Sequence, residues 1–359
     1  MEPLATIPAR SGAAPFRWRV RGSRRRSGLL GLAFALMAGA LLLADTPPGP
    51  EISAGVATEL ETLRTLVDGK DYAAALTLTG RLLATARPGS FDAFVLTEVR
   101  ARIFLHQGNL AAAGPALEAA LQTGIDGRFI APAARLELLL LLAETRYQQA
   151  MADPGKNETR QAVLDRALDC YRQWKTGPGP ATTDTAFLGA SILYQRAVAG
   201  GAATPPDRAL LRAAVAEAEH GLTLSVRLAE NLLVLKVVAL QQLGEASAAT
   251  DQLELLVALQ PDNPGYWRQL SALYLEAAEA TTDAGENRRL NHRALLTFNR
   301  ARTRGLMTGP RATFTLACLD FNLHQFSAAT ELLDTLRDSA DVPEAELDRL
   351  KRALGDRPP

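Results

Sequence analysis

From about residue 56 onward, apolar residues recur at every third or fourth position, in segments of about 12 to 16 residues. This spacing places apolar side chains on one face of an α-helix, because the helix has 3.6 residues per turn. Short turns rich in Gly, Pro or Asp separate the segments. The chain is also poor in the β-branched runs that favour strands. The pattern therefore predicts an all-α chain of antiparallel helix hairpins.

Part of the chain repeats with a fixed period. The clearest unit opens at 264–274 (PGYWRQLSALY), and the unit before it opens at Glu230, 34 residues earlier. In the earlier unit, Gly244 marks the turn and Ala249 lies on the second helix. The order of Trp, Leu, a small residue and Tyr is similar to the opening of the 34-residue tetratricopeptide repeat (TPR), with Ser271 in the Gly place. The resemblance implies a right-handed superhelical solenoid, in which neighbouring hairpins cover one another's apolar faces.

The predicted repeat array covers residues 56–337. A unit numbered from Phe94 matches well, with Gly108 at its turn and Ala113 on its second helix, whereas the hairpins between 131 and 228 have longer internal loops, at 153–159 and 200–207. The predicted units lie near 56–89, 94–127, 131–175, 185–228, 230–263, 264–305 and 311–337, and a capping helix and tail follow at 338–359.

The N-terminus has the order of an export signal. A basic segment at 1–28 precedes an apolar segment at 29–44, and a Pro/Gly-rich linker follows at 45–55. A membrane span needs about 20 apolar residues, so the apolar segment is either the core of a cleaved signal peptide or a retained anchor. Positive charge before it favours export of everything that follows. We expect an exported protein, periplasmic if bacterial, either soluble after cleavage or tethered to the inner membrane.

Charge is distributed unevenly along the chain. Lys and Arg together number 39, as do Asp and Glu, but seven of the basic residues and one acidic residue lie in the first 44 positions. The remainder carries 32 basic and 38 acidic side chains and is mildly acidic. Nucleic-acid binding requires a concentrated positive field. We therefore expect no nucleic-acid partner.

Residues with catalytic or ligating chemistry do not form known motifs. The four histidines lie in different hairpins, and neither phosphate-binding nor nucleophile motifs occur. Cys170 and Cys318 are far apart, which leaves either two buried thiols or one disulfide. We expect no catalysis, cofactor or metal. The alternative is a helical enzyme or accessory factor acting on cell-wall polymers, with two carboxylates assembled from distant segments.

The stretch 257–337 resembles the TPR proteins associated with TonB-type energy transduction. The resemblance depends on an aromatic pair at 266–267, an Ala-rich helix that ends in Gly305-Leu306, and paired Ala before Leu-Leu at 328–333. It implies a bacterial, exported accessory component. The sequence departs from that pattern at 276–293, which forms an insertion, and at 325–326, where a Pro is missing.

Stacked hairpins leave a concave groove lined by their first helices, where extended partners dock. Its mixed lining predicts a protein or peptide partner, and hence a non-catalytic scaffold in the cell envelope. For Glu98 and Arg102 the alternative is an ordinary surface pair. The predicted groove residues are Glu98, Arg102, His106, Val234, Val238, Gln241, Arg268, Leu275 and Glu276.

Overall fold

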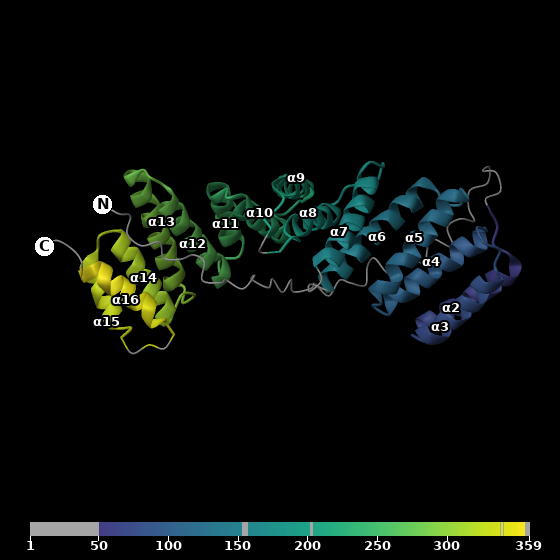
Figure 1. The fold of residues 1–359 in the computed structure, drawn as a ribbon, viewed down its shortest axis with the longest axis horizontal. Coiled ribbons are helices and arrows are strands. Elements are labelled where there is room, and N and C mark those ends of the chain that lie inside the picture. The colour runs from purple at the N-terminus through teal and green to yellow at the C-terminus, as the bar shows by residue number, and fades with distance from the viewer. Residues whose placement is uncertain (1–49, 153–156, 202–203, 338, 340, 356–359) are drawn as a thin grey trace. The chain divides into compact units, whose positions relative to one another are not determined.

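The computed structural model describes residues 50–152, 157–201, 204–337, 339 and 341–355, which form fifteen α-helices and no strand (Figure 1). The predicted all-α class, built from helix hairpins, is confirmed. The basic segment 1–28, the apolar segment 29–44 and the linker up to residue 49 lie outside these residues. No helix in the described part is both long and apolar enough to span a bilayer.

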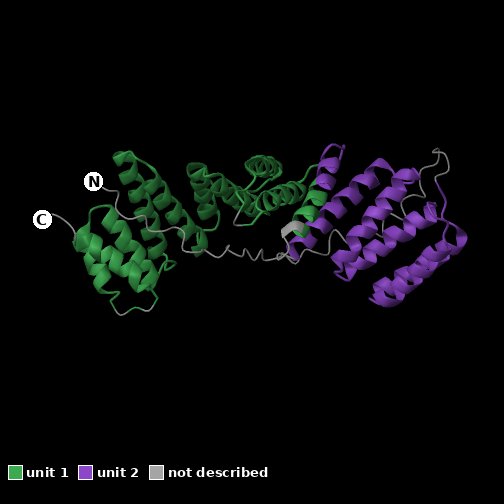
Figure 2. Cartoon of the chain, in the orientation of Figure 1, with its two compact units in different colours: residues 1–9, 153–168, 180–359 green, residues 10–152, 169–179 purple. Residues whose placement is uncertain are grey.

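The chain divides into two compact units (Figure 2), and the division falls within α7 (Asn157–Lys175). Within each unit, consecutive helices pack against one another. Unit 2 contains α2 (Ala54–Asp68), α3 (Tyr72–Thr85), α4 (Phe91–His106), α5 (Leu110–Asp126) and α6 (Pro132–Ala152). Unit 1 contains α8 (Thr183–Ala197), α9 (Arg208–Leu224), α10 (Glu230–Leu243), α11 (Ala246–Leu259), α12 (Pro264–Ala280), α13 (Ala284–Thr303), α14 (Pro310–Asn322), α15 (Phe326–Asp334) and α16 (Glu344–Gly355).

Four hairpin turns share one backbone geometry. In each, a residue with positive φ follows the first helix, and the next N–H bonds to the carbonyl oxygen five residues earlier, as in the Schellman motif. The positive-φ residues are Lys70 (62°), Gly108 (73°), Gly244 (76°) and His324 (62°). The N–H to oxygen distances are 2.8 Å for Asp71 to Leu66, 2.9 Å for Asn109 to Phe104, 2.9 Å for Glu245 to Leu240 and 2.8 Å for Gln325 to Asp320.

A fully buried alanine follows each of these turns on the second helix. It is the fourth residue of that helix, and its small side chain allows the two helices to approach closely. The four alanines are Ala75, Ala113, Ala249 and Ala329. The turn and the alanine together define the repeat.

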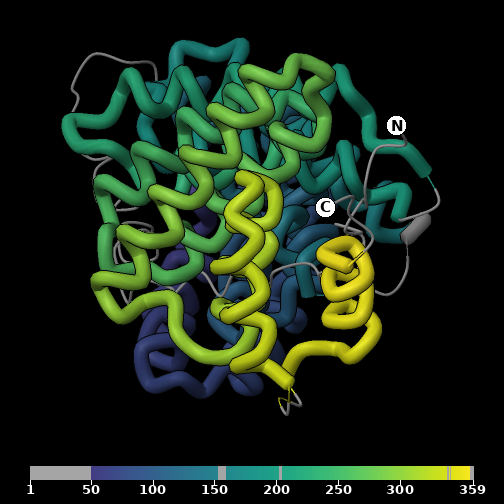
Figure 3. The backbone as a smooth tube through the Cα atoms, turned by 90° about the vertical axis from the view of Figure 1, so that its left-hand side faces the viewer, coloured from purple at the N-terminus to yellow at the C-terminus, as the bar shows by residue number. Residues whose placement is uncertain are grey.

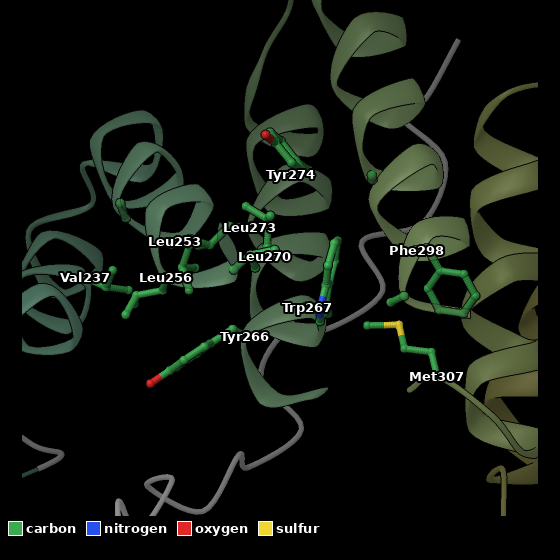
Figure 4. Packing of buried hydrophobic residues seen from close by; sticks show 14 of the residues in the cluster. Val237, Leu253, Leu256, Tyr266, Trp267, Leu270, Leu273, Tyr274, Phe298 and Met307 are labelled. Atoms are coloured by element: carbon green, nitrogen blue, oxygen red, sulfur yellow. The ribbon is translucent and has the colours of Figure 1, made fainter. Parts of the chain in front are cut away.

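The largest core cluster of unit 1 surrounds α12 (Figure 4). Tyr266 and Leu270 point toward Leu253 and Leu256 of α11, whereas Trp267 lies on the side of Phe298 and Met307. The indole Nε1 of Trp267 donates a hydrogen bond to the carbonyl oxygen of Pro261 at 2.7 Å. The TPR-like opening at 264–274 thus packs on both neighbours, as a repeat helix must.

The extra residues at 276–293 lengthen two helices and leave only a short connection. α12 continues to Ala280 and α13 begins at Ala284, where the side chain of Asp283 accepts the N–H of Glu286 at 2.7 Å. By contrast, the described residues between α8 and α9, at 198–201 and 204–207, are not helical. Helix α7 begins at Asn157, so it takes up part of the loop expected at 153–159, and residues 153–156 lie outside the described part.

The last helix, α16, covers the hairpin formed by α14 and α15, as Figure 3 shows from the C-terminal side. Its apolar side chains Leu347 and Leu350 are buried against Phe314 and Leu333. Glu346, next to Leu347, accepts a hydrogen bond from Arg311 of α14 at 3.0 Å, whereas the charged side chains of Asp348, Arg349 and Arg352 are exposed. An amphipathic helix of this kind shields the apolar face of a final repeat.

Candidate functional site

Six of the nine predicted groove residues lie on α10 and α12 of unit 1. Val234, Val238 and Gln241 follow one another at spacings of four and three along α10, so they share a face of that helix. Val238 and Gln241 are half-buried, and Val234 packs partly against the core. The three residues on α12 are Arg268, Leu275 and Glu276. We call these six residues the α10–α12 face.

A hydrogen bond connects the two helices of the α10–α12 face. The amide nitrogen of Gln269, next to Arg268, donates to the side-chain oxygen of Gln241 at 3.0 Å. Gln269 is not among the residues predicted from the sequence. In the sequence, Gln269 was marked only as a second polar residue beside the predicted Arg268. Its contact with Gln241, 28 positions away, depends on the register between the two helices, which a single sequence does not give.

Charge changes sign along α12. Arg268, near the beginning of the helix, is exposed, and its Nε donates to the carbonyl oxygen of Pro264 in its own helix at 3.4 Å. Glu276, two turns later, is also exposed. Desolvation and then the negative charge of Glu276 raise the pKa of Glu279 above its ordinary value. A ligand that crosses this helix therefore meets a positive end and a negative end.

The other three predicted groove residues lie on α4 of unit 2. Arg102 and Glu98 form an ion pair at 2.5 Å within this helix, which is the arrangement of an ordinary i, i+4 pair. His106 stacks on Tyr72 of α3, with ring centroids 6.1 Å apart. α4 belongs to unit 2, whereas the α10–α12 face belongs to unit 1.

Two hydrogen bonds between helices of unit 1 were not predicted from the sequence. Tyr266 donates its hydroxyl to Glu230 of α10 at 2.5 Å. Asn291 of α13 is buried, donates to Asn287 and accepts from Asn322 of α14 at 3.1 Å. The bonds of Tyr266 to Glu230 and of Asn322 to Asn291 cross from helix to helix, so they fix the relative positions of consecutive hairpins in unit 1.

Both cysteines are free and buried, Cys170 in unit 2 and Cys318 in unit 1. The disulfide alternative is therefore wrong. Burial raises the pKa of Cys170 to about 11 and that of Cys318 to about 12. Both thiols stay protonated near neutral pH and are weak nucleophiles there.

A hollow of about 390 Å³ lies between α15 and α16. One carboxylate lines it, Asp334, which accepts a hydrogen bond from Arg337 at 3.0 Å. Its lining residues are Thr330, Leu333, Asp334, Arg337, Lys351 and Leu354. Within the described part of the chain, no three His, Cys, Asp or Glu side chains gather as metal ligands do.

No protein-family model matches the sequence, and no curated protein does. Solved structures with a similar fold include a tetratricopeptide repeat protein from Parabacteroides merdae, 12% identical with a TM-score of 0.44, aligned over 85% of this chain and 100% of that one. The S. pombe nuclear import adaptor Nro1 is 13% identical with a TM-score of 0.45, over 74% and 98%. The TPR2AB domain of yeast Sti1, in complex with pHSP90, is 14% identical with a TM-score of 0.30, over 84% and 99%. These likenesses concern the fold alone.

Proposed function

We propose that this chain is a scaffold that binds a protein or peptide on the α10–α12 face. The observation that carries the proposal is the pairing of Gln241 with Gln269, which connects two consecutive first helices into one surface. Half-buried Val238 and Leu275 lie beside exposed Arg268 and Glu276 on this surface. Apolar positions flanked by polar groups suit a partner that buries a few side chains and orients itself by charge.

The finer proposal concerns the partner and the compartment. The resemblance of 257–337 to TPR proteins associated with TonB-type systems supports a role as an accessory of such a system, and the order of segments at the N-terminus supports export. Export is tested by fusing alkaline phosphatase, which is active only outside the cytoplasm, after residue 55. Activity in the fusion supports export, and an inactive but stable fusion contradicts it.

Charge reversal on α12 tests the binding face. The double variant Arg268→Glu, Glu276→Arg keeps the net charge and changes two exposed side chains, so the fold should be unaffected. We expect this variant to bind the periplasmic domain of the TonB protein from the same organism at least tenfold more weakly than the wild type. Calorimetry with the full chain measures the two affinities.

The matched control exchanges the exposed ion pair of α7, in the variant Asp169→Arg, Arg172→Asp. It should bind like the wild type. Equal binding by all three proteins would contradict the α10–α12 face, whereas binding by none of them would contradict the TonB partner. In the second case, envelope proteins captured by the wild type and lost from the α12 variant would still identify a partner of this face.

A further inference from the structure

The exposed sides of α11 and α13 carry opposite charges. On each helix, exposed residues recur at spacings of three and four, so they form a line along one side. The line of α11 and the turn after it consists of Ser247, Asp251, Leu255, Ala258 and Asp262. The line of α13 consists of Arg288, His292, Leu296, Arg300 and Arg304, with Arg289 beside it. One line is acidic and the other basic, and each has a leucine near its middle.

Two ion pairs fix the register of these lines. Arg293 pairs with Glu254 at 2.7 Å, and Arg304 pairs with Asp262 at 3.6 Å. The helices therefore lie side by side and run in the same direction.

The two leucines lie between these ion pairs, so they are level with each other. Leu255 is 41% exposed and Leu296 is 53% exposed, and both are large apolar side chains. The α11–α13 surface thus has an apolar centre between an acidic edge and a basic edge.

Several charges on this surface are uncompensated. Within the described residues, the side chains of Asp251, Arg288 and Arg300 form no ion pair or hydrogen bond. Asp262 is 90% exposed and holds Arg304 only loosely. These groups remain available to charges from outside the chain.

We propose that the α11–α13 surface binds a second copy of this chain. A two-fold axis parallel to the helices places the acidic line of one copy on the basic line of the other, twice, with Leu255 opposite Leu296 of the second copy. Such an interface is isologous, the commonest kind in oligomers. A purely acidic partner would satisfy α13 but would be repelled by Asp251 and Asp262, so the charge pattern favours a copy of the same surface.

The size of the surface sets the strength of the contact. Seventeen helical residues span about 25 Å at 1.5 Å each, and two adjacent helices are about 20 Å wide, which gives roughly 500 Å² per copy. Stable interfaces bury about 800 Å² per partner. The dimer is therefore weak, reversible and sensitive to salt, since charges surround its centre.

Complementary charge reversals test the proposal in the full chain, kept in a nonionic detergent. One variant reverses the acidic line (Asp251→Arg, Asp262→Arg), and the other reverses the basic line (Arg288→Asp, Arg300→Asp). In sedimentation-equilibrium measurements we expect the wild type to dimerise, each variant alone to associate at least tenfold more weakly, and an equal mixture of the two to regain dimers. A wild type that stays monomeric at all concentrations, or variants that associate like the wild type, would overturn the proposal.

Cysteine crosslinking tests the geometry. The native thiols are buried, so an introduced cysteine is the reactive one. When a mixture of the Leu255→Cys and Leu296→Cys proteins is oxidised, we expect a disulfide-linked heterodimer. Its yield should be several times higher than the yield from a control mixture of the Val226→Cys and Leu296→Cys proteins. Val226 is fully exposed and lies between α9 and α10. Equal yields from the two mixtures would overturn the predicted axis.

Discussion

Arg293 of α13 donates a hydrogen bond to Glu254 of α11 at 2.7 Å, although the two residues are 39 positions apart in sequence. The hydroxyl of Tyr274, on the intervening helix α12, also donates to Glu254. The guanidinium of Arg293 lies over the Tyr274 ring, 4.9 Å from its centroid. Three consecutive helices from two repeats therefore meet at one carboxylate, which fixes how the second hairpin sits on the first.

Removal of the carboxylate should cost more stability than removal of the hydroxyl. Glu254→Ala leaves the buried hydroxyl of Tyr274 without its acceptor, which costs about 1–3 kcal/mol. Tyr274→Phe leaves Glu254 bonded to Arg293 and should cost about 0.5–1.5 kcal/mol. Urea unfolding of both variants measures the difference. Equal losses would contradict the extra cost expected from the unpaired hydroxyl and the lost Arg293 bond in Glu254→Ala.

The buried alanine of the repeat should not tolerate a larger side chain. Ala249→Leu forces three extra heavy atoms into the buried contact between α10 and α11, and overpacking of this kind costs about 1–3 kcal/mol. Ala113→Leu should behave in the same way in unit 2. The control is Ala258→Leu, at an exposed position of α11. Thermal melts that show no difference between Ala249→Leu and this control would contradict the repeat alignment.

Replacing Lys70 by glycine should stabilise the fold, because this exposed lysine has a positive φ in its Schellman turn. Lys70 has a φ of 62°, and the left-handed conformation costs an L-residue about 1–2 kcal/mol. Lys70→Gly should raise the free energy of unfolding by roughly 0.5–1 kcal/mol, after allowance for the more flexible unfolded chain. Lys70→Ala, which keeps the Cβ atom, should give no gain. A similar gain from Ala would show that the lysine side chain, not its backbone, is unfavourable.

Asp320 should reduce stability at neutral pH. It is 6% exposed, and burial raises the pKa of its carboxyl despite the opposing charge of Arg302. The folded state therefore holds the proton more tightly than the unfolded state, and this group favours folding only below the ordinary Asp pKa of about 3.9.

We thus expect Asp320→Asn to raise the melting temperature at pH 7, with a gain that shrinks as the pH falls through the raised pKa and vanishes near pH 4. The control is Asp251→Asn, at an exposed position, which should change the melting temperature little at either pH. A gain from Asp320→Asn that is the same at pH 4 and pH 7 would show that the carboxylate charge is not its cause.

Local patterns predicted the helix pairs, and the reason is physical. Glycine at 108 and 244 and the alanines at 113 and 249 act within one hairpin, so their spacing along the chain is sufficient to place them. The sequence indicated only an insertion at 276–293, and how it divides between α12, a short connection and α13 depends on the packing of the two helices.

The contacts between hairpins could not be predicted from the sequence. The meeting of Glu254 with Arg293 and of Gln241 with Gln269 depends on the register between helices that are not consecutive. The division of the chain within α7 likewise has no marker in the residue pattern. The binding role of the six residues on α10 and α12 stays a prediction.

Site-specific photocrosslinking measures that role most directly. A photoreactive amino acid replaces Val238 on the α10–α12 face, or Ala216 at an exposed position of α9, in the full chain expressed in its own cells. We predict that Val238 gives one discrete adduct with another protein and that the adduct is lost in the Arg268→Glu, Glu276→Arg background, while Ala216 gives none. Adducts from Ala216 but not from Val238, or a Val238 adduct that the charge reversal leaves unchanged, would contradict the account.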